Sequence, residues 1–298
     1  MQTLRIYLLL LSLAGVCHGQ NLKPVRGMPF VNRGHKLAPT CLWLFNEGSG
    51  NKVFDLSGNG RYGTFGGNAP DWVAGDEGNA LYFNAEQADT IGVNAFPFVP
   101  APFTIVAHVR KSSDYTGGYR SIINRGRAYD SGNTNFDFGT VGLCAYIGWY
   151  NSDSWYEHQA SLGTYLDLWI DIAVVVYSNY DNELFKNGIS IGTDASNAAP
   201  ADGSQNTIIG EGHSDWHGDI SRIYFYNRAL SASEIDLLYR EPFCMFERGP
   251  IAMMAIEAPP PSGGQVITII QAGMAPVIFI FIFFTLFCFI KGRKCRPR

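Results

Sequence analysis

The segment from Leu168 to Thr193 constrains the fold of this chain more than any other. It reads LWIDIAVVVYSNYDNELFKNGISIGT. Over Leu168–Tyr177 the apolar residues occupy both alternating positions, which is typical of a strand buried on both faces. A turn at Asp181-Asn182 reverses the chain, and Asn187-Gly188 predicts a second tight hairpin, because both central residues of such a turn need a positive φ. The middle of the protein is therefore expected to be a meander of antiparallel strands.

The composition favours an all-β domain and argues against one class of partner. Of 298 residues, 46% are hydrophobic, 14% are aromatic and 33 are glycines, which suits many strands joined by turns. The 22 basic residues are outnumbered by 26 acidic ones. Since nucleic-acid binding needs a basic surface, we expect no nucleic-acid partner.

Both ends of the chain indicate export and a membrane anchor. Residues 1–19 combine Arg5 with an apolar run and small residues before Gln20, as in a signal peptide. The apolar stretch 272–290 is roughly 28 Å long as a helix, enough to cross a bilayer, and the basic tail 291–298 follows it. A buried core helix is the alternative. We expect a transmembrane helix over 266–290, a cytoplasmic tail, and a type I protein with its ectodomain outside.

The ectodomain divides into three parts. Residues 20–37 are polar and rich in Pro and Gly, which predicts an irregular lead-in. Residues 38–248 form the expected domain, and 249–265 are a linker around Pro259-Pro260-Pro261. Within the domain we expect strands at 40–45, 53–55, 80–83, 91–93, 103–110, 119–124, 136–138, 143–149, 206–210 and 218–226. One helix is predicted at 232–240, where Ser231 and Glu234 form a capping box.

Several turn and packing motifs resemble those of laminin G-like jelly-roll domains in the concanavalin A-like lectin/glucanase superfamily. They are WLFNEGSG from Trp43, DLSGNG from Asp55, the strand Trp169–Val176 leading to Asn187-Gly188, Gly218-Asp219-Ile220, and the run from Tyr226 to Ile235. The resemblance covers about residues 38–248 and implies a two-sheet antiparallel jelly-roll sandwich. It implies carbohydrate or a surface protein as the partner, and calcium as a common structural ion.

The family's calcium suggests a candidate metal site. In this superfold the ion often sits where the first loops meet the last strand, and Asp55 and Asp219 match those places. Calcium needs six to eight oxygen ligands, which loops rich in Asp, Asn and Gly supply. The alternative is an Asx turn at Asp55 and an ordinary strand residue at Asp219.

Aromatic residues among polar ones mark a candidate carbohydrate site. A sugar presents an apolar C–H face and a rim of hydroxyls, so its site needs an aromatic platform beside polar groups. The stretch from Gly148 to His158, expected to be a loop, and a second one from Gly212 to His217 supply both kinds of residue. The ligand-binding candidates are Trp149, Tyr150, Trp155, Tyr156, His213 and Trp216. Alternatively, Trp149 and Trp216 are core residues that cap the sandwich.

The cysteines suggest one disulfide. Cys41, Cys144 and Cys244 lie in the ectodomain. In a jelly roll of this kind the first and last strands lie side by side, which would bring Cys41 near Cys244. Cys144 is then expected to be a buried free thiol. The alternative is that all three are reduced core residues.

Three functions follow from these patterns. The first is a membrane-anchored, non-catalytic recognition module that binds glycan or a partner protein. The second is a structural surface or virion protein whose jelly roll mediates assembly or host attachment. The third is a glycoside hydrolase or lyase, against which stands the missing Glu-x-Asp-x-x-Glu run of related glucanases.

Overall fold

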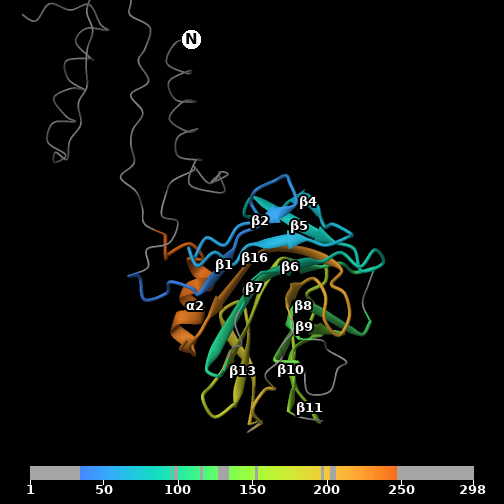
Figure 1. Ribbon diagram of the computed structural model, residues 1–298. Coiled ribbons are helices and arrows are strands. Elements are labelled where there is room, and N and C mark those ends of the chain that lie inside the picture. Colours follow the sequence, from blue (N-terminus) through green and yellow to red (C-terminus); the bar gives the residue numbers. More distant parts are fainter. Residues whose placement is uncertain are drawn as a thin grey trace, which may run out of the picture. The chain divides into compact units, whose positions relative to one another are not determined.

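Two antiparallel sheets form the framework of the described chain (Figure 1). This computed structural model describes residues 34–246 except 95, 97–99, 115–116, 127–133, 152–153, 196–197 and 202–205. The described residues belong to one compact unit, Met1–Arg248. The expected signal peptide, linker, transmembrane helix and basic tail lie outside them. Within the described part, no helix is both long and apolar enough to span a bilayer.

The first sheet contains the central meander. Its order is β14-β13-β12-β7-β16-β5-β4, and β1 also pairs with β16. The strands are β1 (Cys41–Trp43), β4 (Asp71–Ala74), β5 (Asn79–Phe83), β7 (Phe103–Lys111), β12 (Ile170–Val176), β13 (Asn182–Lys186), β14 (Ile189–Asp194) and β16 (Gly218–Tyr226). The expected adjacency of the first and last strands is confirmed, because Cys41 pairs with Phe225 and Trp43 with Ile223.

The second sheet has the order β11-β10-β9-β8-β15-β6-β3-β2. Its strands are β2 (Lys52–Val53), β3 (Gly63–Phe65), β6 (Ile91–Val93), β8 (Tyr119–Arg125), β9 (Phe136–Val141), β10 (Cys144–Asn151), β11 (Ser154–Ser161) and β15 (Thr207–Ile209). All pairings between these named strands are antiparallel. Two of these strands, β3 and β11, are not among those expected from the sequence, and neither is β4 of the first sheet.

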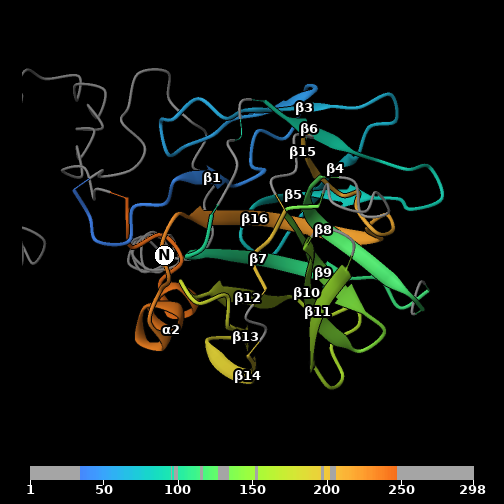
Figure 2. The same ribbon diagram turned by 60° about the horizontal axis from the view of Figure 1, so that its bottom comes forward.

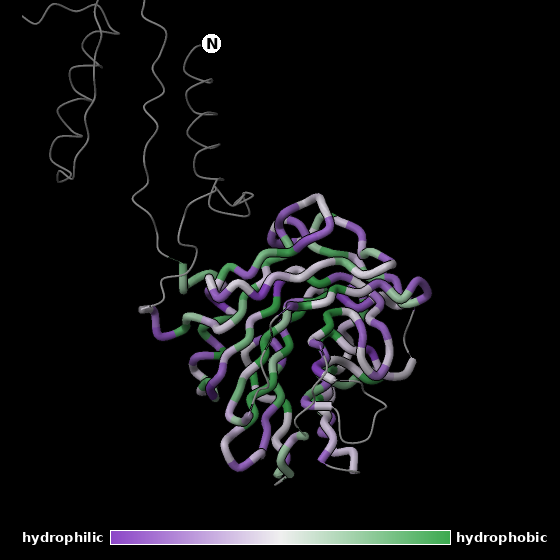
Figure 3. Tube along the Cα trace, in the orientation of Figure 1, coloured by the Kyte–Doolittle hydropathy of each residue, from purple (hydrophilic) through white to green (hydrophobic). Residues whose placement is uncertain are grey.

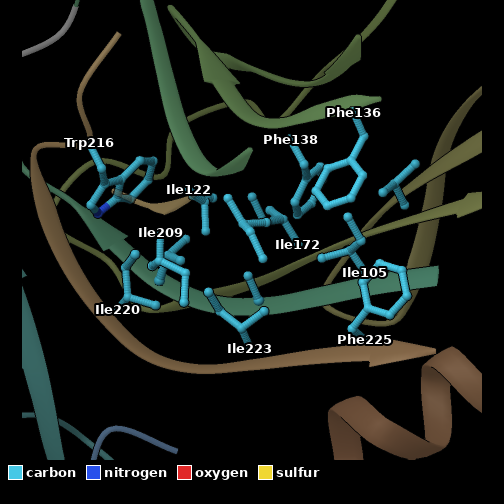
Figure 4. Close-up of a cluster of buried hydrophobic side chains, with 14 of the residues drawn as sticks. Ile105, Ile122, Phe136, Phe138, Ile172, Ile209, Trp216, Ile220, Ile223 and Phe225 are labelled. Carbon is cyan, nitrogen blue, oxygen red and sulfur yellow. The ribbon is translucent and has the colours of Figure 1, made fainter. Parts of the chain in front are cut away.

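The core lies between the two sheets and follows the period of two along each strand. From β7 it receives Ile105 and Ala107, from β12 Ile172 and Val174, and their neighbours face outward. In Figure 4 a line of buried side chains runs from Trp216 at one end to Phe136 and Phe225 at the other. Apolar residues follow the strands, and polar residues gather in the connecting turns (Figure 3).

The Leu168–Thr193 segment folds as predicted. Every residue of β12 is buried, as expected of a strand covered on both faces. Asn187 and Gly188 have φ values of 49° and 81° and join β13 to β14, so the Asn-Gly hairpin is confirmed.

One helix, α2 (Ala232–Arg240), covers the outer face of the first sheet (Figure 2). Its capping box is present as predicted, with Glu234 N donating to the Ser231 hydroxyl and the Glu234 side chain accepting from Ser231 N. Such a cap contributes about 1 kcal/mol. Ile235 and Leu238 are the buried residues of the helix, and they pack on a second apolar cluster that includes Val106 and Tyr224. This second layer explains why β12 has no solvent face.

The expected Cys41–Cys244 disulfide is absent from the structure, in which both residues are free thiols. Cys41 points into the core between the sheets, whereas Cys244 packs against the cluster under α2 on the other side of the first sheet. The adjacency of the first and last strands is therefore not sufficient for a disulfide, because successive side chains of a strand point to opposite faces of the sheet. Cys144 is also free but only half-buried, since it begins β10 instead of lying within it.

Candidate ligand-binding face

The aromatic stretch from Gly148 to His158 forms a hairpin of two long strands, so the expectation of a loop there is wrong. Tyr150 pairs with Trp155, Trp149 with Tyr156, and Asn151 with Ser154 at the turn. Aromatic side chains favour strands, and the pleat points successive residues to opposite faces. Tyr150, Trp155 and Glu157 therefore lie on one face of the hairpin, and Trp149, Tyr156 and His158 lie on the other.

This alternation sends half of the predicted ligand-binding residues into the core. Trp149 and Trp216 are buried in the cluster between the sheets, and Trp149 Nε1 donates to the Ala198 carbonyl over 2.9 Å. Tyr156 is half-buried and packs against the same cluster. Trp149 and Trp216 therefore stabilise the sandwich, as the alternative interpretation has it, and the site proposed for them is wrong. Tyr156 faces the inner side of the hairpin, so the structure does not bring it together with the other candidates.

Tyr150, Trp155 and His213 lie together on the outer face of the second sheet. The rings of Tyr150 and Trp155 are 5.1 Å apart between centroids and nearly edge-on, and those of Trp155 and His213 are 6.3 Å apart. All three side chains are half-buried. Trp155 lies over Gly148 of β10, because a Cβ at Gly148 would stand only 2.2 Å from Trp155 Cζ2.

Tyr119, which the sequence does not single out, completes the ring cluster. It lies on β8, and its ring is 3.9 Å from that of His213 between centroids. Tyr146 supports Tyr119 from below with an edge-on contact at 5.1 Å. Because β8, β9, β10 and β11 are consecutive neighbours in the sheet (Figure 2), Tyr119 can share a surface with Tyr150 and Trp155, although at least 31 positions separate it from them in the chain.

Glu157 places a carboxylate among these rings. Tyr119 Oη lies 3.1 Å and 2.9 Å from its two oxygens, and Trp155 Nε1 donates to Oε2 over 2.8 Å. Burial, and then the bond to Glu157, raise the pKa of Tyr119 to about 12. The phenol therefore stays a donor at neutral pH, and the carboxylate is held in one position.

A buried polar layer fixes the loop that carries His213. Its backbone N–H donates to Ser121 Oγ and to Asp137 Oδ2, each over 2.9 Å. The Ser121 hydroxyl also meets the Tyr146 hydroxyl at 2.9 Å. Burial raises the pKa of Asp137 to about 6, so this carboxylate is mostly ionised at neutral pH although it is shielded from solvent. Burial lowers the pKa of His213, which leaves its ring neutral.

We name this surface the aromatic face and define it by Tyr119, Tyr150, Trp155, Glu157 and His213. It combines three half-buried aromatic rings with an imidazole and a fixed carboxylate. Rings offer apolar contact area with few rotatable bonds, and the carboxylate accepts hydrogen bonds from hydroxyls. The arrangement suits a ligand with an apolar face and hydroxyl groups.

The two predicted calcium ligands do not share a site. Asp55 accepts from the backbone N–H groups of Leu42 and Ser57 through Oδ1, and from that of Arg61 through Oδ2. Asp219 pairs with Arg110 over 2.7 Å. Leu42, which Asp55 contacts, pairs with Tyr224 of β16. Asp219 lies five residues before Tyr224 on the same strand, which separates the two positions by about 15 Å. The Asx-turn interpretation therefore holds for Asp55. Among the described residues no group of three or more His, Cys, Asp or Glu is placed to hold a metal, so calcium binding stays a prediction.

A second polar cluster lies on the outer face of the first sheet. His108 meets Asp171 through Nδ1 and Asp76 through Nε2, the latter at 3.1 Å. Arg222 donates to both oxygens of Asp171 over 2.7 and 2.8 Å and also pairs with Glu77. Because His108, Asp171 and Arg222 are all buried, the cluster offers a ligand little surface. It ties the turn between β4 and β5 to the sheet.

Residues 84–236 match a laminin G-type family model described as the concanavalin A-like lectin/glucanases superfamily. The chain belongs to this superfamily. The expected jelly-roll fold of a laminin G-like domain is thereby confirmed, with an all-β sandwich and one short helix in the described part. No curated protein matches the sequence.

Three solved structures share the fold of this superfamily member. Domain 4 of an extracellular arabinanase from Geobacillus stearothermophilus, solved in complex with arabinotriose, has a TM-score of 0.53 at 17% identity, over 67% of this chain and 98% of that one. The binding domain of Paraclostridial Mosquitocidal Protein 1 has a TM-score of 0.51 at 18% identity, over 66% and 51%. The binding domain of botulinum neurotoxin serotype G has a TM-score of 0.53 at 17% identity, over 68% and 51%. The chain thus spans about half the length of the two toxin domains.

Proposed function

We propose that the protein is an exported, membrane-anchored recognition module that binds carbohydrate through the aromatic face and catalyses no reaction. The observation that carries this proposal is the placement of Tyr119, Tyr150 and Trp155 beside the fixed carboxylate of Glu157. Export and anchoring rest on the signal-like and apolar segments at the two ends of the sequence.

The chemistry of the face supports a sugar ligand. A pyranose ring carries C–H groups on one side that pack on an aromatic ring, and hydroxyls at its edge that donate to a carboxylate. Trp155 is backed by Gly148 and held by its bond to Glu157, so the indole is positioned before a ligand arrives. Preorganised aromatic anchors reduce the entropy lost on binding.

The related structures agree with a binding role. Nearly all of the arabinanase domain aligns with this chain, and that domain was solved with arabinotriose bound. The two toxin domains are described as binding domains. At such low identity these likenesses concern the fold. They support the proposal by showing that this sandwich serves as a binding domain elsewhere.

The carboxylates of the face support a role without hydrolysis. A glycosidase needs two carboxyl groups that both reach the scissile bond. Glu157 is half-buried on the aromatic face, but Asp137 is fully buried beneath the His213 loop and bonded to its backbone. Asp137 therefore cannot act with Glu157 as the second carboxyl group beside a sugar.

A glycan array probed with the purified full-length protein in detergent tests the proposal. We expect binding to a subset of glycans, and Trp155→Ala should weaken it at least tenfold because a central aromatic anchor is lost. Trp72→Ala is the matched control, since Trp72 is a half-buried tryptophan on β4 of the other sheet. Melting temperatures show whether either variant is folded.

Three results would overturn the proposal. Binding that survives Trp155→Ala unchanged would place the ligand elsewhere. No glycan binding, together with assembly into a regular lattice, would favour a structural surface or virion protein. Release of sugars from a polysaccharide panel by the wild-type protein would favour an enzyme.

A further inference from the structure

We propose that the aromatic face selects its ligands by charge, accepting neutral saccharides and rejecting those that carry a carboxylate or a sulfate. This inference rests on the proposed carbohydrate-binding function. It concerns which chemical class of saccharide the face takes, and it follows from the position and the uncompensated charge of Glu157.

Glu157 is fixed where a ligand would lie. Its carboxylate takes hydrogen bonds from Tyr119 and from Trp155, two of the rings that form the face. Gln159, the next outward residue of β11, also donates to it. A saccharide packed on either ring must therefore approach the carboxylate. Three donors from the protein hold it, so it cannot rotate away to avoid an anionic group.

In the described part of this face, no cation offsets the charge of Glu157. Among the residues that the structure describes, no Lys, Arg or His forms an ion pair with Glu157. Of the two arginines of β8, Arg120 alternates to the side opposite Tyr119, where its charge acts on Lys111 and Asp215. Arg125 is buried and donates to the Phe96 carbonyl over 2.9 Å.

The remaining titratable groups of the surface do not add positive charge either. His213 has a lowered pKa and is neutral at pH 7. Asp137, beneath it, has a pKa of about 6 and is mostly ionised at that pH. Two further acids, Glu211 and Asp215, lie in the loop that carries His213. The described titratable groups of this surface therefore carry a net negative charge, although Arg120 partly offsets that of Asp215.

The size of the effect follows from Coulomb's law. Two like charges about 6 Å apart at a protein surface repel enough, at physiological ionic strength, to change an affinity by roughly tenfold. Salt screens that repulsion over a Debye length of about 8 Å at physiological ionic strength. A neutral saccharide meets no such penalty, and its hydroxyls donate to the oxygens of Glu157.

Matched pairs of saccharides test the inference. Calorimetry measures the affinity for each neutral glycan that binds on the array and for its counterpart whose primary hydroxyls are oxidised to carboxylates. Galactotriose and trigalacturonate are an example of such a pair. We expect the wild-type full-length protein to bind the acidic member about tenfold more weakly, and the difference to shrink at high salt. Glu157→Gln keeps an acceptor for Tyr119 and Trp155 and should remove most of the difference.

Glu183→Gln is the matched control. Glu183 is half-buried on β13 of the other sheet and accepts from the Tyr177 hydroxyl over 2.8 Å, much as Glu157 accepts from Tyr119. This variant should keep the full difference between the two saccharides.

The outcomes separate the two proposals. If no glycan binds, the recognition function fails and the inference fails with it. If acidic members bind as tightly as neutral ones, or if the array shows acidic glycans only, the face binds sugars but the charge selection is wrong. Should Glu157→Gln fail to fold, the salt dependence of the wild-type difference decides, because an unchanged difference at high salt would exclude repulsion.

Discussion

At the scale of single residues, Gly148 determines where the Trp155 indole lies. A methyl group at Gly148 would stand 2.2 Å from Trp155 Cζ2, which is far inside van der Waals contact. Gly148→Ala should therefore push the indole off β10 and weaken glycan binding about tenfold, as removal of the ring does. Titration with an array-positive glycan measures the loss.

The control for this prediction is another strand glycine of the same sheet. Gly92 on β6 has only the Thr64 carbonyl oxygen near its missing Cβ, at 4.0 Å, so Gly92→Ala should leave binding unchanged. Equal affinities for Gly148→Ala and the wild-type protein would show that the position of the indole does not matter to the ligand.

Asp55 offers a second prediction at this scale. Its carboxylate accepts three backbone N–H groups, from Leu42, Ser57 and Arg61. Asp55→Ala leaves these donors without their partner and should lower the free energy of unfolding by about 1–3 kcal/mol. Urea denaturation should give the same loss in calcium and in EDTA. The exposed Asp194, changed to Ala, is the control.

A loss confined to calcium-containing buffer would contradict this assignment of Asp55. It would mean that the carboxylate acts through a bound ion instead of through the turn. Calcium binding as such is tested by the wild-type protein alone, whose melting temperature should fall in EDTA if a structural ion is present.

The sequence indicates that aromatic and polar residues gather between Gly148 and His158, but it does not show which of them face outward. Trp149 and Tyr150 are neighbours of the same chemical kind, yet one is in the core and the other on the surface. Which alternate residues face the core depends on how the strand pairs with its neighbours in the sheet, and that pairing involves residues far away in the sequence. For the same reason Tyr119 and Glu157 could not be joined from the sequence alone.

At the scale of secondary-structure elements, local chemistry predicts what forms locally. The Ser231–Glu234 capping box and the Asn187-Gly188 turn carry their own signals, and both are found where expected. The short edge strands β3 and β4 carry none, because Gly63–Phe65 and Asp71–Ala74 owe their pairing to distant partners on β6 and β5. Tertiary context, more than propensity, makes such segments strands.

The cluster around His108 gives a prediction about pH at this scale. Burial disfavours the imidazolium, but hydrogen bonds to Asp171 and Asp76 outweigh it and raise the pKa of His108 from 6.5 to about 9. A raised pKa in the folded state means that the stabilisation is complete below pH 6.5 and is lost as the pH rises through about 9. The shift corresponds to at most about 3 kcal/mol.

Comparison with His108→Gln isolates the contribution of this cluster, since titrating groups that do not interact with His108 cancel in the difference. We expect the variant to be less stable than the wild-type protein at pH 6, and the gap between them to narrow towards pH 9 and above. Urea denaturation across this range measures both. A gap that stays constant with pH would mean that the charge of His108 does not stabilise the folded protein, and that the ring acts through other contacts such as its packing on Trp169, whose ring lies parallel to it at 5.0 Å.

At the scale of the whole molecule, the question is on which side of a membrane the jelly roll lies. The described part ends at Phe246, and the sequence continues through the Pro-rich stretch 249–265 into the apolar run before the basic tail. If 266–290 spans the bilayer with the tail inside, the jelly roll and its aromatic face are outside, where a glycan of another cell or particle can reach them.

Protease added to intact cells that express the full-length protein tests this topology. Cleavage needs a segment that enters the protease site in extended form, and strands paired in two sheets resist it. We therefore expect cuts in 249–265, release of a folded fragment that still binds glycan, and a small membrane-bound stub that carries the tail. A cytoplasmic protein of the same cells must stay intact as the control. Survival of the full-length chain, while a known surface protein is digested, would place the domain inside and leave the aromatic face without access to extracellular sugars.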